Sequence, residues 1–249
     1  MRRHIPSALL LIALIAIWHW ASTNFGLSKL VLPEPTLVAA AWWRGWQTGY
    51  FWPHLWQTLQ EVLLGLMGGT LLGLCGGLLL AEVPLLRRLA MPYVVVSQVV
   101  PKLALAPLFM VWFGLGMTST VVIVALICFF PLLESTLTAV TKVDAQRLDL
   151  FRMLGASRWQ TLWRLKIPAG LPAILAGWRV AVVLALVGAV VGEFIGANQG
   201  LGAVIIASQG MMDTALMFAA LINITGLGLA LYFLTLLLEK QLLQHHPHL

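Results

Sequence analysis

Long uninterrupted runs of apolar residues constrain this chain more than any other feature of its sequence. A helix needs about 20 mostly apolar residues to cross a bilayer. The six expected spans cover residues 5–23, 57–81, 89–113, 117–140, 169–195 and 213–238. Since the chain is 60% hydrophobic and 10% charged, it lacks the polar residues that cover a soluble domain. We therefore expect an all-α integral membrane protein, with a single transmembrane domain over residues 1–249.

Lysines and arginines are unevenly distributed between the two sides of these spans. The side that includes both ends of the chain carries Arg2, Arg3, Arg87, Arg88, Lys142, Arg147, Arg152, Arg158, Arg164, Lys166 and Lys240. The opposite loops carry only Lys29 and Arg44. Because cytoplasmic loops are enriched in basic residues, both termini are predicted to be cytoplasmic. The net charge of +6 is therefore assigned to this face and not to nucleic-acid binding.

Tryptophans cluster between the first span, residues 5–23, and the second. They include Trp42, Trp43, Trp46, Trp52 and Trp56. Because Trp prefers the boundary between membrane and water, we interpret residues 33–56 as a segment along the outer surface. Pro35 suits the first turn of a helix in this segment. The core of five spans would follow, over residues 57–240.

Glycine recurs every four residues in the second span, at Gly65, Gly69, Gly73 and Gly77. Residues four apart lie on one face of a helix, so these glycines would form a ridge without side chains. Such a ridge lets another helix approach closely. The spacing does not distinguish a helix of the same chain from a helix of a second copy.

Sequence signatures of enzymes are absent. No G-x-x-x-x-G-K-[ST] phosphate loop occurs, so the chain is not expected to hydrolyse ATP itself. The H-E-x-x-H and G-x-S-x-G motifs are absent as well. His245, His246 and His248 could chelate a metal, but a terminal tail is usually disordered. We therefore predict neither a catalytic residue nor a metal site.

The longest loop on the basic side, residues 141–168, contains the stretch DLFRMLGASRWQTLWRLKIP. Its pattern predicts two short helices, near residues 144–154 and 157–166, with Gly155 as the break. Asp149 and Arg152 would be neighbours on the first helix. An amphipathic anchor to anionic lipid is one interpretation of this loop. A lipid anchor would not require the glycine break, but the break does not exclude it.

The same stretch resembles the coupling loop of the permease subunits of binding-protein-dependent ABC importers. The family's motif is E-A-A, a glycine four residues after the second alanine, and I-x-L-P starting ten residues beyond that glycine. The matching positions are Asp149-Leu150-Phe151 for E-A-A, Gly155 for the glycine and Leu165-Lys166-Ile167-Pro168 for the ending. Leu150 and Phe151 are bulkier than the family's alanines, so the fit to a partner must differ in detail.

Two further stretches, residues 100–116 and 192–202, resemble the nitrate/sulfonate/taurine branch of this family. The resemblance extends over about residues 32–243. It implies a type I ABC importer permease in the cell inner membrane, acting as a pair of copies. A separate ATPase subunit would bind ATP and Mg, and a substrate-binding protein would deliver the solute from outside. This chain would hold no cofactor of its own.

In that family the coupling loop docks into a groove on the ATPase subunit. Helix-in-groove docking requires an apolar face with a charged rim. The resemblance implies an apolar face made by Leu150, Phe151, Leu154 and Ala156, with Arg152 and Arg158 at the rim. Opening and closing of the ATPase pair would then tilt the attached spans and give alternating access.

Lys102 is the first candidate for the translocation path, because ionisable groups inside a membrane are costly and default to functional hypotheses. It is expected near mid-membrane, directly after Pro101, which locally breaks the helix. Ser97 and Gln98 of the same span are assigned to the same path. A cation there could meet an anionic solute; an internal salt bridge or a snorkelling side chain is the alternative.

Three further charged residues within the spans are assigned to the path or its gates. Glu134 and Arg179 are expected at similar depths and are predicted to pair, structurally or as an inner gate. Glu193, near the outer end of the fifth span, is predicted to face the binding protein or to line the outer gate.

We therefore predict the membrane-spanning subunit of an ABC importer for a small solute. A nitrate-, sulfonate- or taurine-type anion is the first choice, and Lys102 agrees with it. Related permeases also resemble carriers of thiamine-precursor pyrimidines or riboflavin. An ion-coupled secondary transporter is the alternative of a different class. It predicts paired broken helices, inverted repeats and carboxylates at mid-depth, and the sequence shows no convincing internal repeat.

Overall fold

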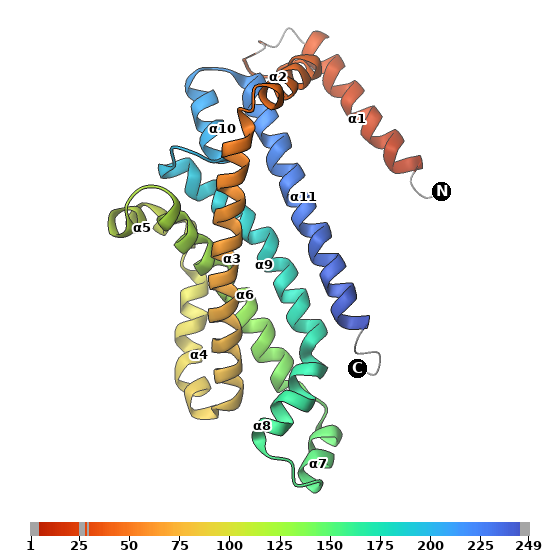
Figure 1. Cartoon of the computed structure of the whole chain (residues 1–249), viewed down its shortest axis with the longest axis vertical. Coiled ribbons are helices and arrows are strands. Elements are labelled where there is room, and N and C mark those ends of the chain that lie inside the picture. Colours follow the sequence, from red (N-terminus) through yellow and green to blue (C-terminus); the bar gives the residue numbers. More distant parts are fainter. Residues whose placement is uncertain (1–4, 25–27, 29, 245–249) are drawn as a thin grey trace.

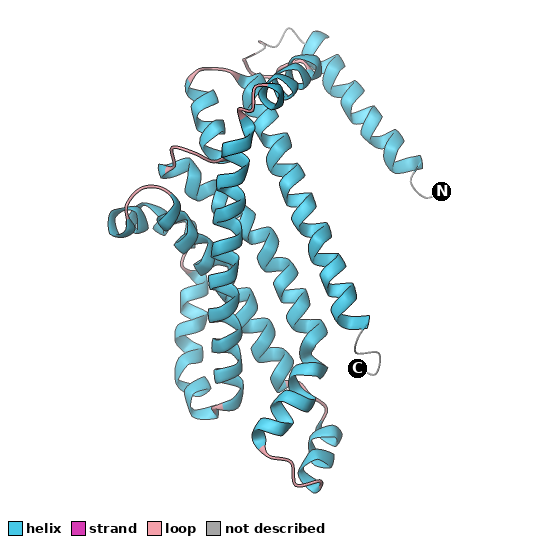
Figure 2. Cartoon of the chain, in the orientation of Figure 1, coloured by secondary structure: helices cyan, strands magenta, loops and turns pink. Residues whose placement is uncertain are grey.

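The computed structural model describes residues 5–24, 28 and 30–244, which form helices joined by short loops, with no strand among them (Figures 1 and 2). The predicted all-α fold is confirmed. The elements in chain order are α1 (Ile5–Asn24), α2 (Pro35–Gln47), α3 (Phe51–Glu82), α4 (Pro84–Val99), η1 (Lys102–Leu105), α5 (Ala106–Phe113), α6 (Met117–Thr141), α7 (Ala145–Met153), α8 (Arg158–Thr161), η2 (Leu162–Lys166), α9 (Ile167–Gly196), α10 (Leu201–Gly210) and α11 (Thr214–Gln244).

Four continuous helical segments are long and apolar enough to cross a membrane. They are α3, α6, α11 and the segment Arg158–Gly196, which ends in α9. They match the spans expected at residues 57–81, 117–140, 213–238 and 169–195. α4 and the η1–α5 segment would add a fifth span if they are counted together, and the described apolar part of α1, Leu9–Asn24, is shorter. The expected number of six spans is therefore not confirmed among the described residues.

The third expected span, residues 89–113, is not a straight helix. The helical segment formed by η1 and α5 leaves α4 at 82°, and Pro101 lies at this bend. Proline has no backbone N–H, and the residue before a proline disfavours the helical conformation. Val100 is accordingly extended, with φ −63° and ψ 125°. The predicted break at Pro101 is confirmed, and it turns the chain sharply.

The glycine ridge of α3 packs against α6 of the same chain. A Cβ added at Gly73 would lie 2.7 Å from Leu132 Cβ and 2.8 Å from the backbone oxygen of Phe129. Added Cβ atoms at Gly69 and Gly77 would likewise meet α6 backbone oxygens, at 2.6 and 2.8 Å. The two helices therefore approach too closely for side chains on this face. The question left open by the spacing is answered: the ridge serves packing within the chain.

α3, α6 and α9 form the packed centre of the molecule, with α6 in contact with both of the others. Buried side chains from the three helices meet there, including Val62, Val124, Cys128, Ala181 and Ala185. α11 packs beside α9 and α10, while α1 extends away from the other helices (Figure 1). α7 and α8 lie at one end of the bundle, and α2 and α10 lie at the other (Figure 1).

The tryptophan-rich segment forms the short helix α2, which begins at Pro35 as predicted. Trp42 and Trp46 of α2 donate their indole N–H groups to Asn223 Oδ1 of α11, at 3.2 and 3.1 Å. These two tryptophans therefore attach α2 to the bundle, in addition to any preference for the membrane boundary. α3 begins at Phe51, so the second span starts earlier than the expected residue 57.

Candidate functional site

The loop at residues 141–168 folds into the two short helices that its sequence predicts. The Asp144 side chain caps α7 by accepting a hydrogen bond from Gln146 N at 3.0 Å. α8 begins with a capping box, in which Ser157 Oγ accepts from Gln160 N while Gln160 Oε1 accepts from Ser157 N. Such caps satisfy backbone groups at helix starts. The loop is therefore a defined structure and not a flexible connection.

Gly155 separates the two helices, as predicted, with φ +70°. This left-handed conformation is typical of the residue that follows a helix C-terminus. The backbone N–H of Ala156 donates to Phe151 O at 3.0 Å and closes the last turn of α7. Residues other than Gly and Asn rarely adopt a backbone φ in this region. Gly155 therefore determines the angle at which α7 meets α8.

The second helix of the loop continues into the fifth span without a break. α8 passes into a π-helical turn, η2, and then directly into α9. Pro168 lies in the first turn of α9, and a widened turn accommodates its missing N–H group. The expected helix at residues 157–166 is thus the first part of one helix that reaches Gly196. A movement of α8 is therefore a movement of α9.

The surface of the loop carries exposed apolar side chains. Met153 and Leu154 at the end of α7 are 86% and 73% exposed, Leu150 is exposed beside them, and Trp159 of α8 is 70% exposed. Phe151 and Ala156 are half-buried. Contiguous exposed apolar surface marks an interaction site. Met153 belongs to this surface and was not among the predicted coupling residues.

Charged groups surround this apolar surface. Arg152 Nη1 pairs with Asp149 Oδ1 at 2.8 Å, and both side chains are exposed. Arg158 is exposed at the start of α8. An exposed pair of this kind contributes little to stability, so its charges remain available to a partner. Arg152 and Arg158, the residues assigned to a charged rim, are thus exposed on the same loop as the apolar residues, and their role in docking stays a prediction.

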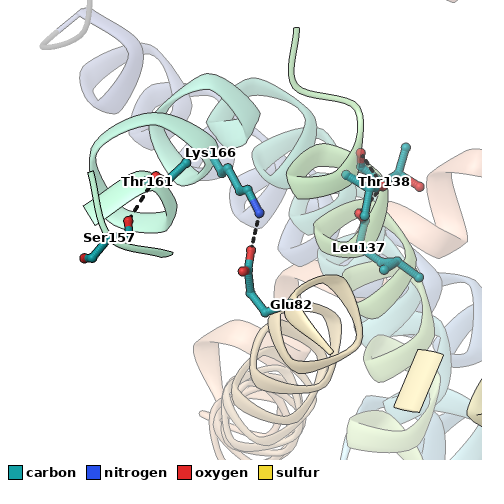
Figure 3. Close-up of polar contacts among 7 residues, drawn as sticks. Glu82, Leu137, Thr138, Ser157, Thr161 and Lys166 are labelled. Carbon is teal, nitrogen blue, oxygen red and sulfur yellow. Dashed lines mark hydrogen bonds and ion pairs between the residues drawn. The ribbon is translucent and has the colours of Figure 1, made fainter. Parts of the chain in front are cut away.

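An ion pair attaches the loop to the C-terminal end of α3. Lys166 Nζ lies 2.6 Å from Glu82 Oε1 (Figure 3), and both side chains are largely buried. The pair borders a cavity of about 510 Å³ between the loop and the α3–α4 turn, lined by Ala81, Glu82, Pro84, Leu148, Arg152, Ala156, Arg158, Thr161 and Lys166. Sequence reasoning missed Glu82. The signal was available, because Glu82 ends α3 and the second half of that helix carries no other charge.

A second cavity brings together three predicted path residues from different elements. Gln98 of α4, Lys102 of η1 and Glu134 of α6 line a cavity of about 530 Å³. Lys102 Nζ lies 4.4 Å from the centre of the Phe130 ring, a distance at which a cation is attracted to an aromatic face. Ser97 does not line this cavity; its hydroxyl donates to Val94 O at 2.7 Å.

The predicted pair between Glu134 and Arg179 is wrong. Arg179 Nη2 lies 3.5 Å from Glu239 Oε1 of α11, whereas Glu134 is exposed to the cavity beside Lys102. No ion pair involves Glu134 or Lys102 within the described part of the chain. Similar depth in the membrane does not bring two residues together when their helix faces point to different neighbours.

Glu193 is only 1% exposed, which does not fit the predicted contact with the binding protein, and its alternative place at an outer gate stays a prediction. Its carboxylate accepts hydrogen bonds from Thr58 Oγ1 at 2.5 Å and from Gly202 N at 2.6 Å. It therefore joins α9 to α3 and α10. Sequence reasoning also missed Glu61, which lies alone in an apolar span, the same signal that singled out Lys102. The histidines at positions 245, 246 and 248 lie outside the described residues.

Residues 69–244 match the family model described as the binding-protein-dependent transport system inner membrane component. The chain is 38% identical, over 94% of its length and 87% of the relative's, to the riboflavin transport system permease protein RibX of Chloroflexus aurantiacus. It is 30% identical, over 95% of its length and 88% of the relative's, to the taurine transport system permease protein TauC of Escherichia coli.

The fold is similar to that of the inward-facing MetNI methionine ABC transporter. The TM-score is 0.69 at 18% identity, over 78% of this chain and 97% of that chain. At this identity the likeness concerns the fold alone. The family match begins at Gly69, the second glycine of the ridge. It includes the cavity beside the α7–α8 loop, the cavity around Lys102 and the whole segment from α7 to α9.

Proposed function

Because this chain belongs to the family of binding-protein-dependent transport system inner membrane components, we propose that it forms the solute path of an ATP-driven ABC importer. A separate ATPase subunit binds ATP and Mg, a substrate-binding protein delivers the solute, and a second copy of this chain completes the path. The α7–α8 end and both termini lie on the cytoplasmic side, as the distribution of basic residues indicates.

The exposed apolar surface on α7 and α8 carries this proposal. Met153, Leu154 and Trp159 are exposed on helices that leave the bundle at one end (Figure 1). Exposed apolar side chains on helices outside the bundle support a surface that a partner covers. The one-helix connection from α8 to α9 supports a mechanical role, since a partner that moves α8 also moves a membrane span.

The cavity around Lys102 supports a narrower proposal for the solute. A purely anionic solute such as nitrate would meet Glu134 as well as Lys102, and like charges in one cavity repel. A taurine-type solute, with an amino group and a sulfonate, satisfies both charges. A riboflavin-type heterocycle is the second candidate, because the identity to RibX is 38% against 30% to TauC.

Uptake into proteoliposomes tests the function and the solute together. The chain is reconstituted with its proposed partner ATPase and binding protein, and uptake of labelled taurine and of riboflavin is measured. We expect uptake of one of them that requires ATP, the binding protein and the partner ATPase. Uptake driven by an ion gradient without ATP would instead indicate a secondary transporter. Uptake of nitrate alone would contradict the proposed solute.

A further inference from the structure

Two carboxyl groups are buried next to each other where α3, α9 and α10 meet. Glu61 and Glu193 are 0% and 1% exposed. Thr58, which is hydrogen-bonded to Glu193, lies one turn before Glu61 on the same face of α3. Neither takes part in an ion pair among the described residues. Two uncompensated negative charges in such a place are very costly. We refer to Glu61 and Glu193 as the carboxyl pair.

Glu193 has the surroundings of a charged carboxylate. Thr58 Oγ1 and Gly202 N donate to its two oxygens, at 2.5 and 2.6 Å. Gly202 is the second residue of α10, and a helix N-terminus carries partial positive charge. Leu201 N donates to Thr58 Oγ1 at 2.9 Å, so the same hydroxyl receives one hydrogen bond from α10 and gives one to Glu193.

Glu61 has the surroundings of a neutral carboxyl group. Gln57 Nε2 donates to its Oε1 at 2.8 Å. Its Oε2 is buried and has no hydrogen-bond partner. An ionised oxygen without a donor is strongly disfavoured in a water-free site, whereas a proton on Oε2 removes the charge. When two carboxyl groups share a site, one of them holds a proton.

Among the described residues, no ion pair reaches the carboxyl pair, and the surrounding segments carry few titratable groups. His54 of α3 accepts a hydrogen bond from Gly200 N through Nδ1, at 3.1 Å, so that nitrogen carries no proton. α10 has no acidic or basic side chain, and neither have residues 117–129 of α6 or residues 214–228 of α11. Arg44 of α2 is exposed. The charge of the carboxyl pair therefore depends on its own proton.

We propose that Glu61 and Glu193 share one proton and that this proton holds α10 against α3 and α9. Loss of the proton would place two charges side by side and weaken the contacts of Glu193 with Thr58 and Gly202. α10 borders a cavity of about 440 Å³ together with Glu193 and Asn198, so its position shapes that cavity. This inference concerns the folded chain and does not depend on the transported solute.

Infrared difference spectroscopy of the purified chain in lipid nanodiscs tests the shared proton directly. A protonated carboxyl group has a carbonyl band that a carboxylate lacks. We expect this band in the wild type near neutral pH, its loss in Glu61→Gln, and its persistence in Glu193→Gln, where the burial of Glu61 still disfavours its charged form. A wild-type difference spectrum without the band, or a band unchanged in Glu61→Gln, would overturn the proposal.

Thermal unfolding as a function of pH tests the effect on the fold. Between about pH 6 and about pH 9.5, the apparent Tm of the wild type should fall by about 5–10 °C. In Glu61→Gln, which resembles the protonated residue in shape, the fall should be absent. Glu34→Gln, an acidic position outside the carboxyl pair, should retain the wild-type fall. Equal pH profiles for wild type and Glu61→Gln would contradict the proposal, even if transport is unaffected.

Discussion

At Gly155 the backbone has φ +70°, and nothing lies within 4 Å of an added Cβ. The obstacle to a side chain is therefore conformational and not steric. A β-branched residue at this φ costs on the order of 2 kcal/mol, which the short helix α7 can avoid by changing its angle to α8. We expect Gly155→Val to lose most of its ATPase co-purification and substrate-stimulated ATP hydrolysis, measured with the reconstituted complex.

Gly155→Asn is the matched control for this substitution. Asn adopts the left-handed conformation more readily than other residues with a Cβ, so it adds a side chain without changing the angle. This variant should retain about the wild-type ATPase association. If Gly155→Val also assembles and hydrolyses ATP normally, the angle between α7 and α8 does not matter for coupling.

Single residues also show where reasoning from the sequence succeeds. Pro35, Pro101 and Gly155 act through their own backbone chemistry, and each lies where the sequence predicts: at a helix start, at a bend and at a helix end. The pairing of Glu134 with Arg179 was predicted from depth alone. Two residues on neighbouring helices also need to face each other, which is decided by the rotation of each helix about its axis. That rotation results from packing between helices, and no short stretch of sequence specifies it.

Among the helices, the contact of α3 with α6 depends most on small residues. A Cβ at Gly73 would approach Leu132 Cβ to 2.7 Å and a backbone oxygen to 2.8 Å, and the backbone cannot move aside as a side-chain end can. Overpacking of this kind costs about 1–3 kcal/mol. We expect Gly73→Ala to lower the apparent Tm of the purified chain by several degrees.

Gly68→Ala provides the comparison for Gly73→Ala within the same helix. Its added Cβ would meet only Ala125 Cβ, at the ordinary contact distance of 3.6 Å. Alanine also has a higher helix propensity than glycine. Gly68→Ala should therefore leave the apparent Tm unchanged or raise it. Equal destabilisation by both variants would mean that the ridge is not a specific contact.

The ion pair between Glu82 and Lys166 connects the α7–α8 loop to α3, the helix that the glycine ridge holds against α6. Lys166→Glu places two acidic residues together, so we expect weaker loop attachment and a loss of substrate-stimulated ATP hydrolysis. The double variant Glu82→Lys with Lys166→Glu restores the attraction with reversed order. It should recover much of the activity, measured in the reconstituted complex; a double variant as impaired as the single one would exclude a role for the pair.

At the level of the helices, the sequence predicts extents better than shapes. Apolar runs place the four continuous spans, because burial in a membrane depends on composition along the chain. They do not predict the 82° turn between α4 and α5, which requires neighbours that hold both segments. The apolar runs also do not predict the union of α8, η2 and α9, since a helix near residues 157–166 and a separate span at residues 169–195 are expected from the sequence.

In the molecule as a whole, three regions follow one another along the bundle. The exposed surface of α7 and α8 lies at one end, the cavity of Lys102 and Glu134 borders the packed helices, and the carboxyl pair lies where α3, α9 and α10 meet. α9 contributes to all three, because it continues α8, lines the cavity through Leu184 and Val187, and carries Glu193. A tilt of this one helix therefore reaches each region.

The last prediction concerns the cavity that α9 shares with η1 and α6. Lys102 is a half-buried cation next to Phe130. It forms no ion pair among the described residues, although Glu134 lines the same cavity, so its charge is available to a solute. Losing a hydrogen bond to a charged group costs about 1.5–3 kcal/mol, which corresponds to a decrease in the uptake rate of about tenfold or more. We expect this decrease for Lys102→Ala in proteoliposomes at limiting solute.

Lys142→Ala, which removes an exposed cation outside the cavity, should transport at the wild-type rate. Because Lys102→Arg keeps the charge, it should recover part of the uptake; wild-type transport by Lys102→Ala would remove this residue from the solute path.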